Sequence, residues 1–238
     1  MRALVLAHDA QSVAGMIGDR LAERGIEVDT FVVCPDHERP HEHAPLPDLA
    51  PYDLVVPMGS IWSVDDVDTI GAWIGDELEL LRRATDDGRP VLGICFGGQA
   101  LATALGGSVG RAPRPEIGWY EIDSAIPAVV PPGPWMQWHH DRFELPPGAE
   151  LLASSDVGPQ LFRVGRNVGT QFHPEVDPPH LERWLSMADP EYLADLDVDR
   201  IRADTAAHEA DARRRCHALV DWFLDDVSGL GARLPPRG

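Results

Sequence analysis

A single cysteine stands among glycines in the stretch GICFGGQ, residues 93–99, directly after an apolar run and before an alanine-rich one. Read as strand, tight turn and helix, this is the pattern of a nucleophile elbow, which exposes one side chain above a sheet edge. Gly93, Gly97 and Gly98 leave room for the turn, because side chains there would collide with neighbouring backbone. The positive end of the following helix favours the thiolate, the reactive form of Cys95.

The same stretch also fits roles in which Cys95 has no chemistry. A free cysteine is usually a small, buried apolar residue, and glycine-rich turns between strand and helix also occur in nucleotide-binding folds. A phosphate loop fits poorly, because the stretch contains neither GxxxxGK[ST] nor GxGxxG. Taken alone, the stretch leaves Cys95 open between a core residue and a nucleophile.

A cysteine nucleophile requires a general base, usually histidine, and a group that orients the base. The segment GTQFHPE places His173 and Glu175 two positions apart at the end of an apolar strand, where alternate side chains share one face. An imidazole and a carboxylate therefore come together without help from the rest of the fold. Alone, HPE also fits a turn with a solvated glutamate; together with the elbow, it predicts a base and its orienting group.

The elements that must position these residues fall into two halves. The first 107 residues alternate strand and helix patterns, which predicts a parallel sheet, and the third and fourth strands are apolar enough to be buried on both faces. From there to about residue 175, short segments separated by proline and glycine predict antiparallel strands at the edge of that sheet. The expected strands cover residues 2–8, 27–33, 52–59, 90–97, 118–124, 134–141, 149–156, 160–166 and 167–175, and the expected helices cover 12–25, 65–83 and 99–105.

After Pro178 the chain turns helical, and a long helix is expected from about Asp197 to Asp226. Its apolar residues recur at helical spacing, with a weaker stretch in the middle. The pattern predicts a helix that docks on the domain or takes part in oligomerisation.

Composition excludes several classes of function. The formal net charge of −19 argues against nucleic acid or an acidic membrane as partner, because phosphate binding needs clustered positive charge. All 20 basic residues are arginine, so Schiff-base chemistry on lysine is excluded. The cysteines, Cys34, Cys95 and Cys216, are too few for a disulfide framework, and we find no signal peptide or membrane-spanning run. We expect a cytoplasmic protein with a small-molecule or protein partner.

The loop CPDHERPHEH, residues 34–43, contains Cys34 and three histidines, all of them residue types that bind zinc. Their spacing matches no closed four-ligand pattern, and the loop is rich in proline. We therefore expect a solvated loop and no metal site.

GICFGGQ and, about 80 residues later, QFHPE resemble the motifs of the class I, triad-type glutamine amidotransferases. Further segments resemble the stand-alone, GMP-synthase-like branch of that family. The resemblance implies a flavodoxin-like, doubly wound and mostly parallel α/β sheet with helices on both faces, an antiparallel extension and a C-terminal helical segment. Residues 1–188 would form the amidotransferase domain and residues 189–238 a helical extension. The further segments are YDLVVPMGS, PEIGW, WHHDRFELP and QLFRVGRNVGTQFHPE.

The resemblance also implies a role for each matching residue. Cys95 would attack the side-chain amide carbon of glutamine, His173 would transfer the proton, and Glu175 would orient the imidazole. The backbone N–H groups of Gly59 and Phe96 would form the oxyanion hole. Glutamate and ammonia would leave by way of a γ-glutamyl thioester, with no metal or cofactor.

Four further residues are implied to line the substrate site, and one of them departs from the family. Gln99 matches a position that helps to hold glutamine, although a helix-surface residue explains it equally well. His139, His140 and Asp141 stand where the family has HGD, so His140 replaces a glycine at the pocket rim. We interpret them as part of the substrate wall; a second catalytic histidine pair is the alternative.

The oxyanion loop departs from the family as well. The usual GGP is Met58-Gly59-Ser60 here, which keeps glycine at the position whose N–H matters. We expect the oxyanion hole to form, in a loop that is looser for the loss of its proline.

Three functions fit these residues. The first is a glutaminase that supplies ammonia to a partner synthetase or synthase. The second is a γ-glutamyl hydrolase that acts on another γ-glutamyl amide or peptide with the same catalytic groups. The third, a non-catalytic interaction subunit, is disfavoured because Cys95, His173 and Glu175 are all present. The acceptor of the nitrogen and the oligomeric state stay open.

Overall fold

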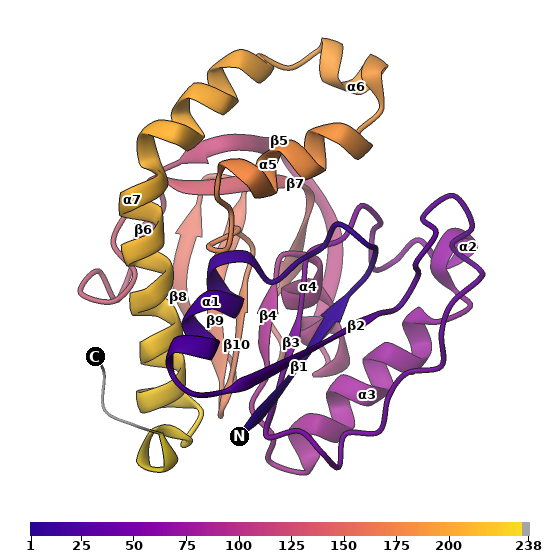
Figure 1. Cartoon of the computed structure of the whole chain (residues 1–238), viewed down its shortest axis with the longest axis vertical. Coiled ribbons are helices and arrows are strands. Elements are labelled where there is room, and N and C mark those ends of the chain that lie inside the picture. The colour runs from indigo at the N-terminus through magenta and orange to yellow at the C-terminus, as the bar shows by residue number, and fades with distance from the viewer. Residues whose placement is uncertain (235–238) are drawn as a thin grey trace.

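The computed structural model describes residues 1–234, and a mixed sheet runs through its middle (Figure 1). Five of its strands are parallel, in the order β2-β1-β3-β4-β10, with β3 joined to β4 by a bridge between Val55 and Val91. This confirms the predicted α/β fold with a mostly parallel sheet. The bounds of these strands are β1 Arg2–Ala7, β2 Glu27–Val32, β3 Leu54–Pro57, β4 Leu92–Ile94 and β10 Asn167–Thr170.

The remaining strands are antiparallel, as expected, but only some of them extend the main sheet. Strands β9, β8 and β6 continue it beyond β10. Strands β5 and β7 instead pair as a separate ribbon, and β5 starts ten residues before the expected residue 118, because its first half pairs with the end of β7. The bounds are β5 Ser108–Tyr120, β6 Asp123–Ser124, β7 Trp135–Glu144, β8 Glu150–Ser155 and β9 Gly158–Val164.

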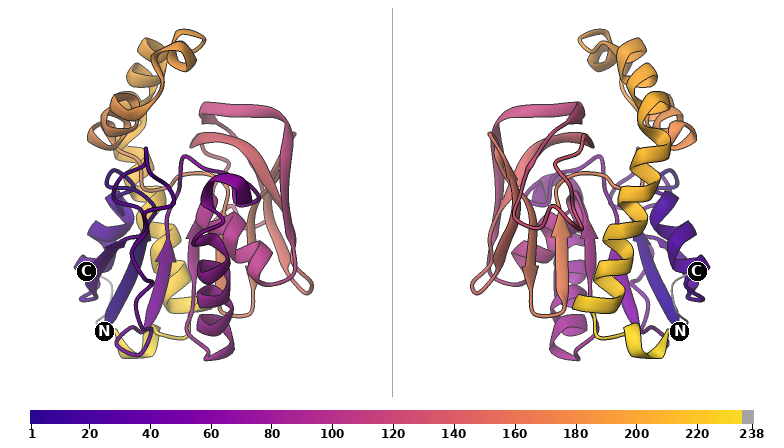
Figure 2. Two further views of the ribbon diagram at one scale, coloured as in Figure 1. Left: turned by 90° about the vertical axis from the view of Figure 1, so that its right-hand side faces the viewer. Right: turned by 90° about the vertical axis from the view of Figure 1, so that its left-hand side faces the viewer.

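Helices cover both faces of the sheet, as alternate residues of β1 show. Ala3 and Val5 pack in a core with helices α1 and α7, whereas Leu4 and Leu6 pack in a second core with α3 and α4. The β5–β7 ribbon packs against α5 and α7 in a third core, through Met136, Leu181 and Ile201, while the rest of the ribbon extends away from these helices (Figure 2). The bounds are α1 Gly15–Glu23, α2 Val67–Ile70, α3 Ile74–Asp86, α4 Phe96–Ala104, α5 Pro178–Met187, α6 Pro190–Ala194 and α7 Val198–Trp222.

The prediction of a single helix over residues 65–83 is wrong. The segment forms two helices, α2 and α3, because Gly71 ends the first and Trp73 leaves the helical region with φ −136° while it buries its ring completely. In contrast, the long C-terminal helix is confirmed. The Asp197 side chain caps α7 at the N–H of Arg200, and a π-helical turn over Phe223–Val227 continues it.

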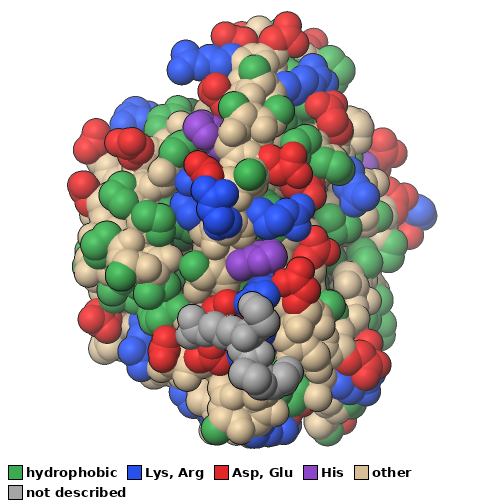
Figure 3. Space-filling model, turned by 60° about the vertical axis from the view of Figure 1, so that its left-hand side comes forward, with side chains coloured by type: hydrophobic (Ala, Val, Ile, Leu, Met, Phe, Trp, Pro, Cys, Tyr) green, Lys and Arg blue, Asp and Glu red, His purple; other side chains and the backbone are tan. Residues whose placement is uncertain are grey.

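Helix α7 lies beside α1 (Figure 1), and buried charged side chains join the two. Arg24, which is 3% exposed, contacts Asp221 at 2.6 Å and Asp225 at 2.7 Å, and Arg20 contacts Asp221 at 2.7 Å. Cys216 lies in the same core, fully buried. Basic and acidic side chains alternate over the outer surface of this region (Figure 3). Residues 235–238 of the expected extension lie outside the described residues, and the boundary at 188/189 stays a prediction.

None of the helices within residues 1–234 combines the length and the apolar character needed to cross a membrane.

We predict that Asp221→Ala lowers the free energy of unfolding by about 3 kcal/mol at pH 7, because it leaves two largely buried arginines without a shared carboxylate. Burial raises the pKa of Asp221, but hydrogen bonds from Arg20 and Arg24 lower it by more. The contribution of this carboxylate is therefore present above the ordinary aspartate pKa and is lost as pH falls through the lowered value. Urea unfolding at a series of pH values measures this difference.

The matched control is Asp199→Ala, whose side chain is 99% exposed beside Arg202. It is expected to change the free energy of unfolding by less than about 0.5 kcal/mol. Equal losses in the two variants would contradict the docking role of Asp221.

Candidate active site

Cys95 occupies a strained turn between β4 and α4. Its backbone has φ 50° and ψ −107°, and it is the only non-glycine residue with positive φ in the described part of the chain. Close packing enforces this turn. A Cβ atom on Gly97 would overlap the carbonyl of Pro57, and one on Gly98 would lie 2.5 Å from the carbonyl oxygen of Thr170. The structure thus places Cys95 at an elbow, with the side chain 5% exposed.

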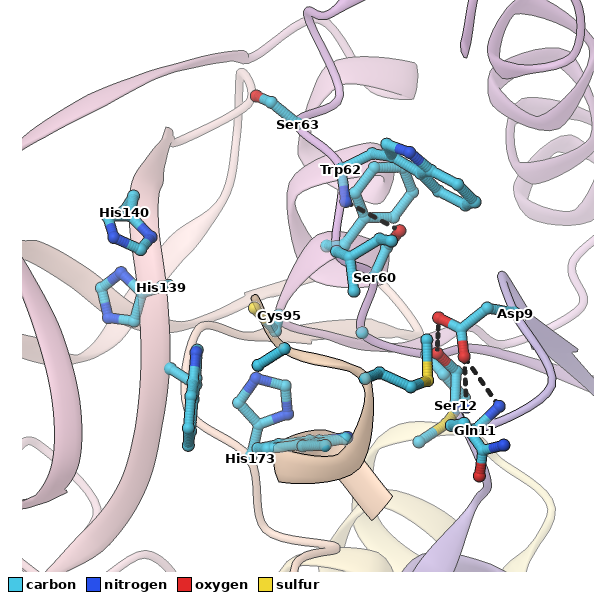
Figure 4. Close-up of a pocket in the computed structure, with 18 of the residues that line it drawn as sticks. Asp9, Gln11, Ser12, Ser60, Trp62, Ser63, Cys95, His139, His140 and His173 are labelled. Carbon is cyan, nitrogen blue, oxygen red and sulfur yellow. Dashed lines mark hydrogen bonds between the residues drawn. The ribbon is translucent and has the colours of Figure 1, made fainter. Parts of the chain in front are cut away.

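The structure brings His173 and Glu175 to this cysteine. Nδ1 of His173 lies 2.8 Å from Oε1 of Glu175, and Figure 4 shows the imidazole beside Cys95. Burial lowers the pKa of His173, but the Glu175 carboxylate and the interaction with Cys95 outweigh this and raise it. Burial raises the pKa of Glu175, whereas the paired imidazole lowers it by more. The arrangement favours a charged imidazole on an ionised carboxylate.

The loop Met58-Gly59-Ser60, in which the sequence predicts the oxyanion hole, lies against both Cys95 and His173. A Cβ on Gly59 would lie 2.8 Å from Cε1 of His173 and 3.9 Å from Cβ of Cys95. The Met58 carbonyl accepts a hydrogen bond from Gly97 N–H at 3.0 Å, so the N–H of Gly59 points to the opposite side of that trans peptide. Within residues 1–234, neither Gly59 nor Phe96 donates its N–H to a backbone carbonyl.

Three of the four expected substrate residues are held by hydrogen bonds or ion pairs at the wall of the same cavity. Gln99 is 3% exposed and donates to the Asp141 carbonyl and to Oε1 of Gln171, each at 3.2 Å, so the helix-surface interpretation is wrong.

Nε2 of His139 lies 3.2 Å from Oε2 of Glu116, away from Cys95, which contradicts a second catalytic pair. His140 lies 5.7 Å from the Tyr192 ring. The Asp141 carboxylate pairs with Arg111 at 3.2 Å.

Sequence reasoning missed several residues of the site. Gln171 donates from Nε2 to Sγ of Cys95 at 3.5 Å; its position two residues before His173, on the same strand face, was a usable signal. His180 and Trp184 come from α5, with the Trp184 ring 4.6 Å from the His173 ring and 5.0 Å from the His180 ring. No local pattern marks these two, since the fold alone brings α5 to the cysteine.

The cavity around Cys95 has a volume of about 520 Å³, within the range of small-molecule sites. Asp9 and Ser12 form one edge, where the Ser12 hydroxyl donates to the Asp9 carboxylate at 2.7 Å. Other parts of the wall are aromatic and come from the loop after β3 and from β7, α5 and α6. They are Trp62, Trp138, Trp184 and Tyr192. No group of three or more metal-ligating side chains is arranged to hold an ion within residues 1–234.

A cysteine at a strand-to-helix elbow, with a histidine–glutamate pair above a flavodoxin-like sheet, defines a cysteine-dependent amide hydrolase. The family model "Glutamine amidotransferase class-I" matches residues 6–186, and the chain belongs to this family. A crystal structure of a glutamine amidotransferase from Thermotoga maritima superposes with a TM-score of 0.82 at 27% identity, covering 95% of this chain and 99% of that one.

The chain is similar to two kinds of known enzymes, and it aligns with a much larger share of one kind than of the other. The GMP synthase (glutamine-hydrolyzing) of Aeropyrum pernix is 40% identical over 114 residues, 42% of this chain. The chain spans only about a fifth of the length of that protein and of the other GMP synthases it matches. Gamma-glutamyl peptidase 5 of Arabidopsis thaliana is 35% identical over 217 residues, which are 85% of this chain and 83% of the relative.

We predict that Gly59→Ala slows the alkylation of Cys95 by iodoacetamide by roughly tenfold, because the thiolate depends on its basic neighbour. The added methyl group would press on Cε1 of a histidine that Glu175 and Trp184 hold in place. Mass spectrometry of the alkylated peptide gives the rate. Gly75→Ala is the control, since a Cβ there meets nothing within 4 Å; equal rates in the two variants would argue against this packing.

Proposed function

We propose that the chain hydrolyses the side-chain amide of glutamine through Cys95, His173 and Glu175. The observation that supports this most directly is the 2.8 Å contact between His173 and Glu175 beside a cysteine held at an elbow. The three groups supply a nucleophile, a proton carrier and an orienting carboxylate, which is the set that amide cleavage requires.

In the first half of the reaction, Sγ of Cys95 attacks the amide carbon and the C=O electron pair moves to oxygen. The N–H groups of Gly59 and Phe96 donate to this oxyanion, and one such donor typically contributes about 3 kcal/mol. The His173 imidazolium gives its proton to the amide nitrogen, the C–N bond breaks, and ammonia leaves a γ-glutamyl thioester on Cys95.

In the second half, His173 acts as the base. It takes a proton from water as the water oxygen attacks the thioester carbon, and the resulting oxyanion again lies at Gly59 and Phe96. Collapse of this intermediate breaks the C–S bond, returns the thiolate to Cys95 and releases glutamate. Glu175 stabilises the charged imidazole, which is present at the start of the first half and forms again in the second.

We further infer that the ammonia serves a synthetase or synthase. The GMP synthases matched here carry "glutamine-hydrolyzing" in their names and are several times longer than the matched region. The acceptor chemistry would then lie outside the region that these relatives share with the chain. The three cysteines are free, which fits action in the reducing cytoplasm.

The central test is ammonia release from glutamine, measured with the purified chain. Cys95→Ala is expected to lower the rate by at least about 10³-fold, because no other group replaces the thiolate. Cys34→Ala removes a buried cysteine far from the triad in sequence and is expected to keep the wild-type rate. A Cys95→Ala protein with full activity, or a wild-type protein that does not turn over glutamine, would overturn the proposal.

A second candidate is hydrolysis of a larger γ-glutamyl amide or peptide by the same groups. Two observations favour it: the cavity extends from Cys95 to the aromatic side chains of α5 and α6, and a plant γ-glutamyl peptidase aligns over most of both chains. In this reaction an amine takes the place of ammonia as the leaving group.

For this candidate, we predict that γ-glutamylphenylalanine is hydrolysed and that Tyr192→Ala lowers its kcat/KM by roughly tenfold, since a ring contact is lost. The kcat/KM for glutamine, whose leaving group is ammonia, is expected to stay unchanged. Leu151→Ala, an exposed residue outside the cavity, is the control. Amino-acid analysis of the products gives both rates, and a panel in which glutamine alone reacts would eliminate the candidate.

A further inference from the structure

Behind the oxyanion loop lies a buried ion pair that the reaction scheme does not use. His8 follows β1, Glu77 lies in α3, and both side chains are completely buried. Nε2 of His8 is 3.0 Å and 3.1 Å from the two carboxylate oxygens of Glu77. Desolvation offsets much of the attraction in such a pair, so stability alone is a weak reason for its presence.

The second nitrogen of the same ring faces the loop. Nδ1 of His8 lies 3.0 Å from the carbonyl oxygen of Gly59. A carbonyl oxygen only accepts, so Nδ1 carries the hydrogen and donates it. Burial lowers the pKa of His8, but Glu77 and the Gly59 carbonyl outweigh burial and raise it, which fits a ring protonated on both nitrogens.

This hydrogen bond completes the anchoring of Gly59. On one side, Gly97 N–H holds the Met58 carbonyl; on the other side, His8 holds the carbonyl of Gly59 itself. Both peptide groups that flank Gly59 are therefore fixed in orientation, and so is its N–H. The loop has Ser60 in place of the family proline, so no ring fixes φ there.

The same imidazole also supports the second oxyanion residue. The Phe96 ring lies 4.5 Å from the His8 ring in an edge-on arrangement, and Trp73 stacks on His8 at 5.8 Å. One buried side chain thus touches Gly59 and Phe96, the two residues whose N–H groups we assign to the oxyanion.

We propose that His8, oriented by Glu77, is a positioning residue that holds the oxyanion loop in the geometry of the tetrahedral intermediate. This inference rests on the proposed amide hydrolysis. Its contacts with the site are those to Gly59 and Phe96, and through them His8 would act.

Two single substitutions test the contributions of the two ring nitrogens of His8 separately. In His8→Asn the amide takes the place of Nδ1 and can still donate to Gly59, but Glu77 is left unpaired. In His8→Gln the amide takes the place of Nε2 and can pair with Glu77, but the Gly59 carbonyl loses its donor. A purely structural role predicts that His8→Gln is the milder change, because the buried Glu77 carboxylate keeps a hydrogen-bond donor there and loses it in His8→Asn.

A positioning role predicts the reverse order for catalysis. We expect kcat for glutamine to fall by about 10²-fold in His8→Gln and to be at least tenfold higher in His8→Asn, while KM stays within about twofold. Iodoacetamide alkylates the fully buried Cys216 only in unfolded molecules, so the rates are normalised to the fraction of protein that stays unlabelled at Cys216. If His8→Asn does not fold, His8→Asn with Glu77→Gln takes its place. A kcat for His8→Gln equal to or above that of the asparagine variant would overturn the inference.

The rate of the wild-type chain shows whether a negative result concerns the role of His8 or the proposed hydrolysis itself. No glutamine turnover by the wild-type chain would count against the hydrolase itself. Turnover that Cys95→Ala abolishes and His8→Gln leaves intact would count against the role of His8 alone.

Discussion

The site depends on the close backbone packing that holds Cys95 at positive φ. A non-glycine residue in that region costs about 1–3 kcal/mol and persists only where its surroundings enforce it. Here Gly97 packs on the carbonyl of Pro57 at the end of β3, and Gly98 packs on the carbonyl of Thr170 at the end of β10. Those strands lead directly into the oxyanion loop and into His173. The contacts that strain the cysteine therefore also bring its two chemical partners to it.

Within the described residues, three buried histidines are paired with buried glutamates around this cavity, and each pair does something different. His173 and Glu175 face the cysteine. His139 is turned toward Glu116, which also accepts hydrogen bonds from Ser155 and Gln160. The third pair, His8 with Glu77, lies behind Gly59. The difference comes from what the second ring nitrogen of each histidine meets, which the pairing itself does not determine.

The sequence was most informative where the chemistry is local. The elbow and the HPE segment each lie within seven residues, so glycine spacing and strand alternation pointed to both. Each segment alone left a structural interpretation open, and only the two together favoured the chemical one. The His8–Glu77 contact joins positions 69 apart, and α5 reaches the cavity only through the fold. Helix α3 shows the same limit, because the burial of Trp73 overrides a helical pattern that runs unbroken from Asp65.

The C-terminal helices connect overall stability to the site. Helix α7 is anchored to α1 by Arg20 and Arg24, and the first turn of α1 lies under the triad: Met16 N–H donates to the carbonyl of Glu175 at 3.0 Å. A Cβ on Gly15 would overlap that same carbonyl. The orientation of Glu175 is thus coupled to the docking of α7 through one helix. Helices α5 and α6 directly precede α7 and form one wall of the cavity, so the same anchoring also holds the chain end of that wall.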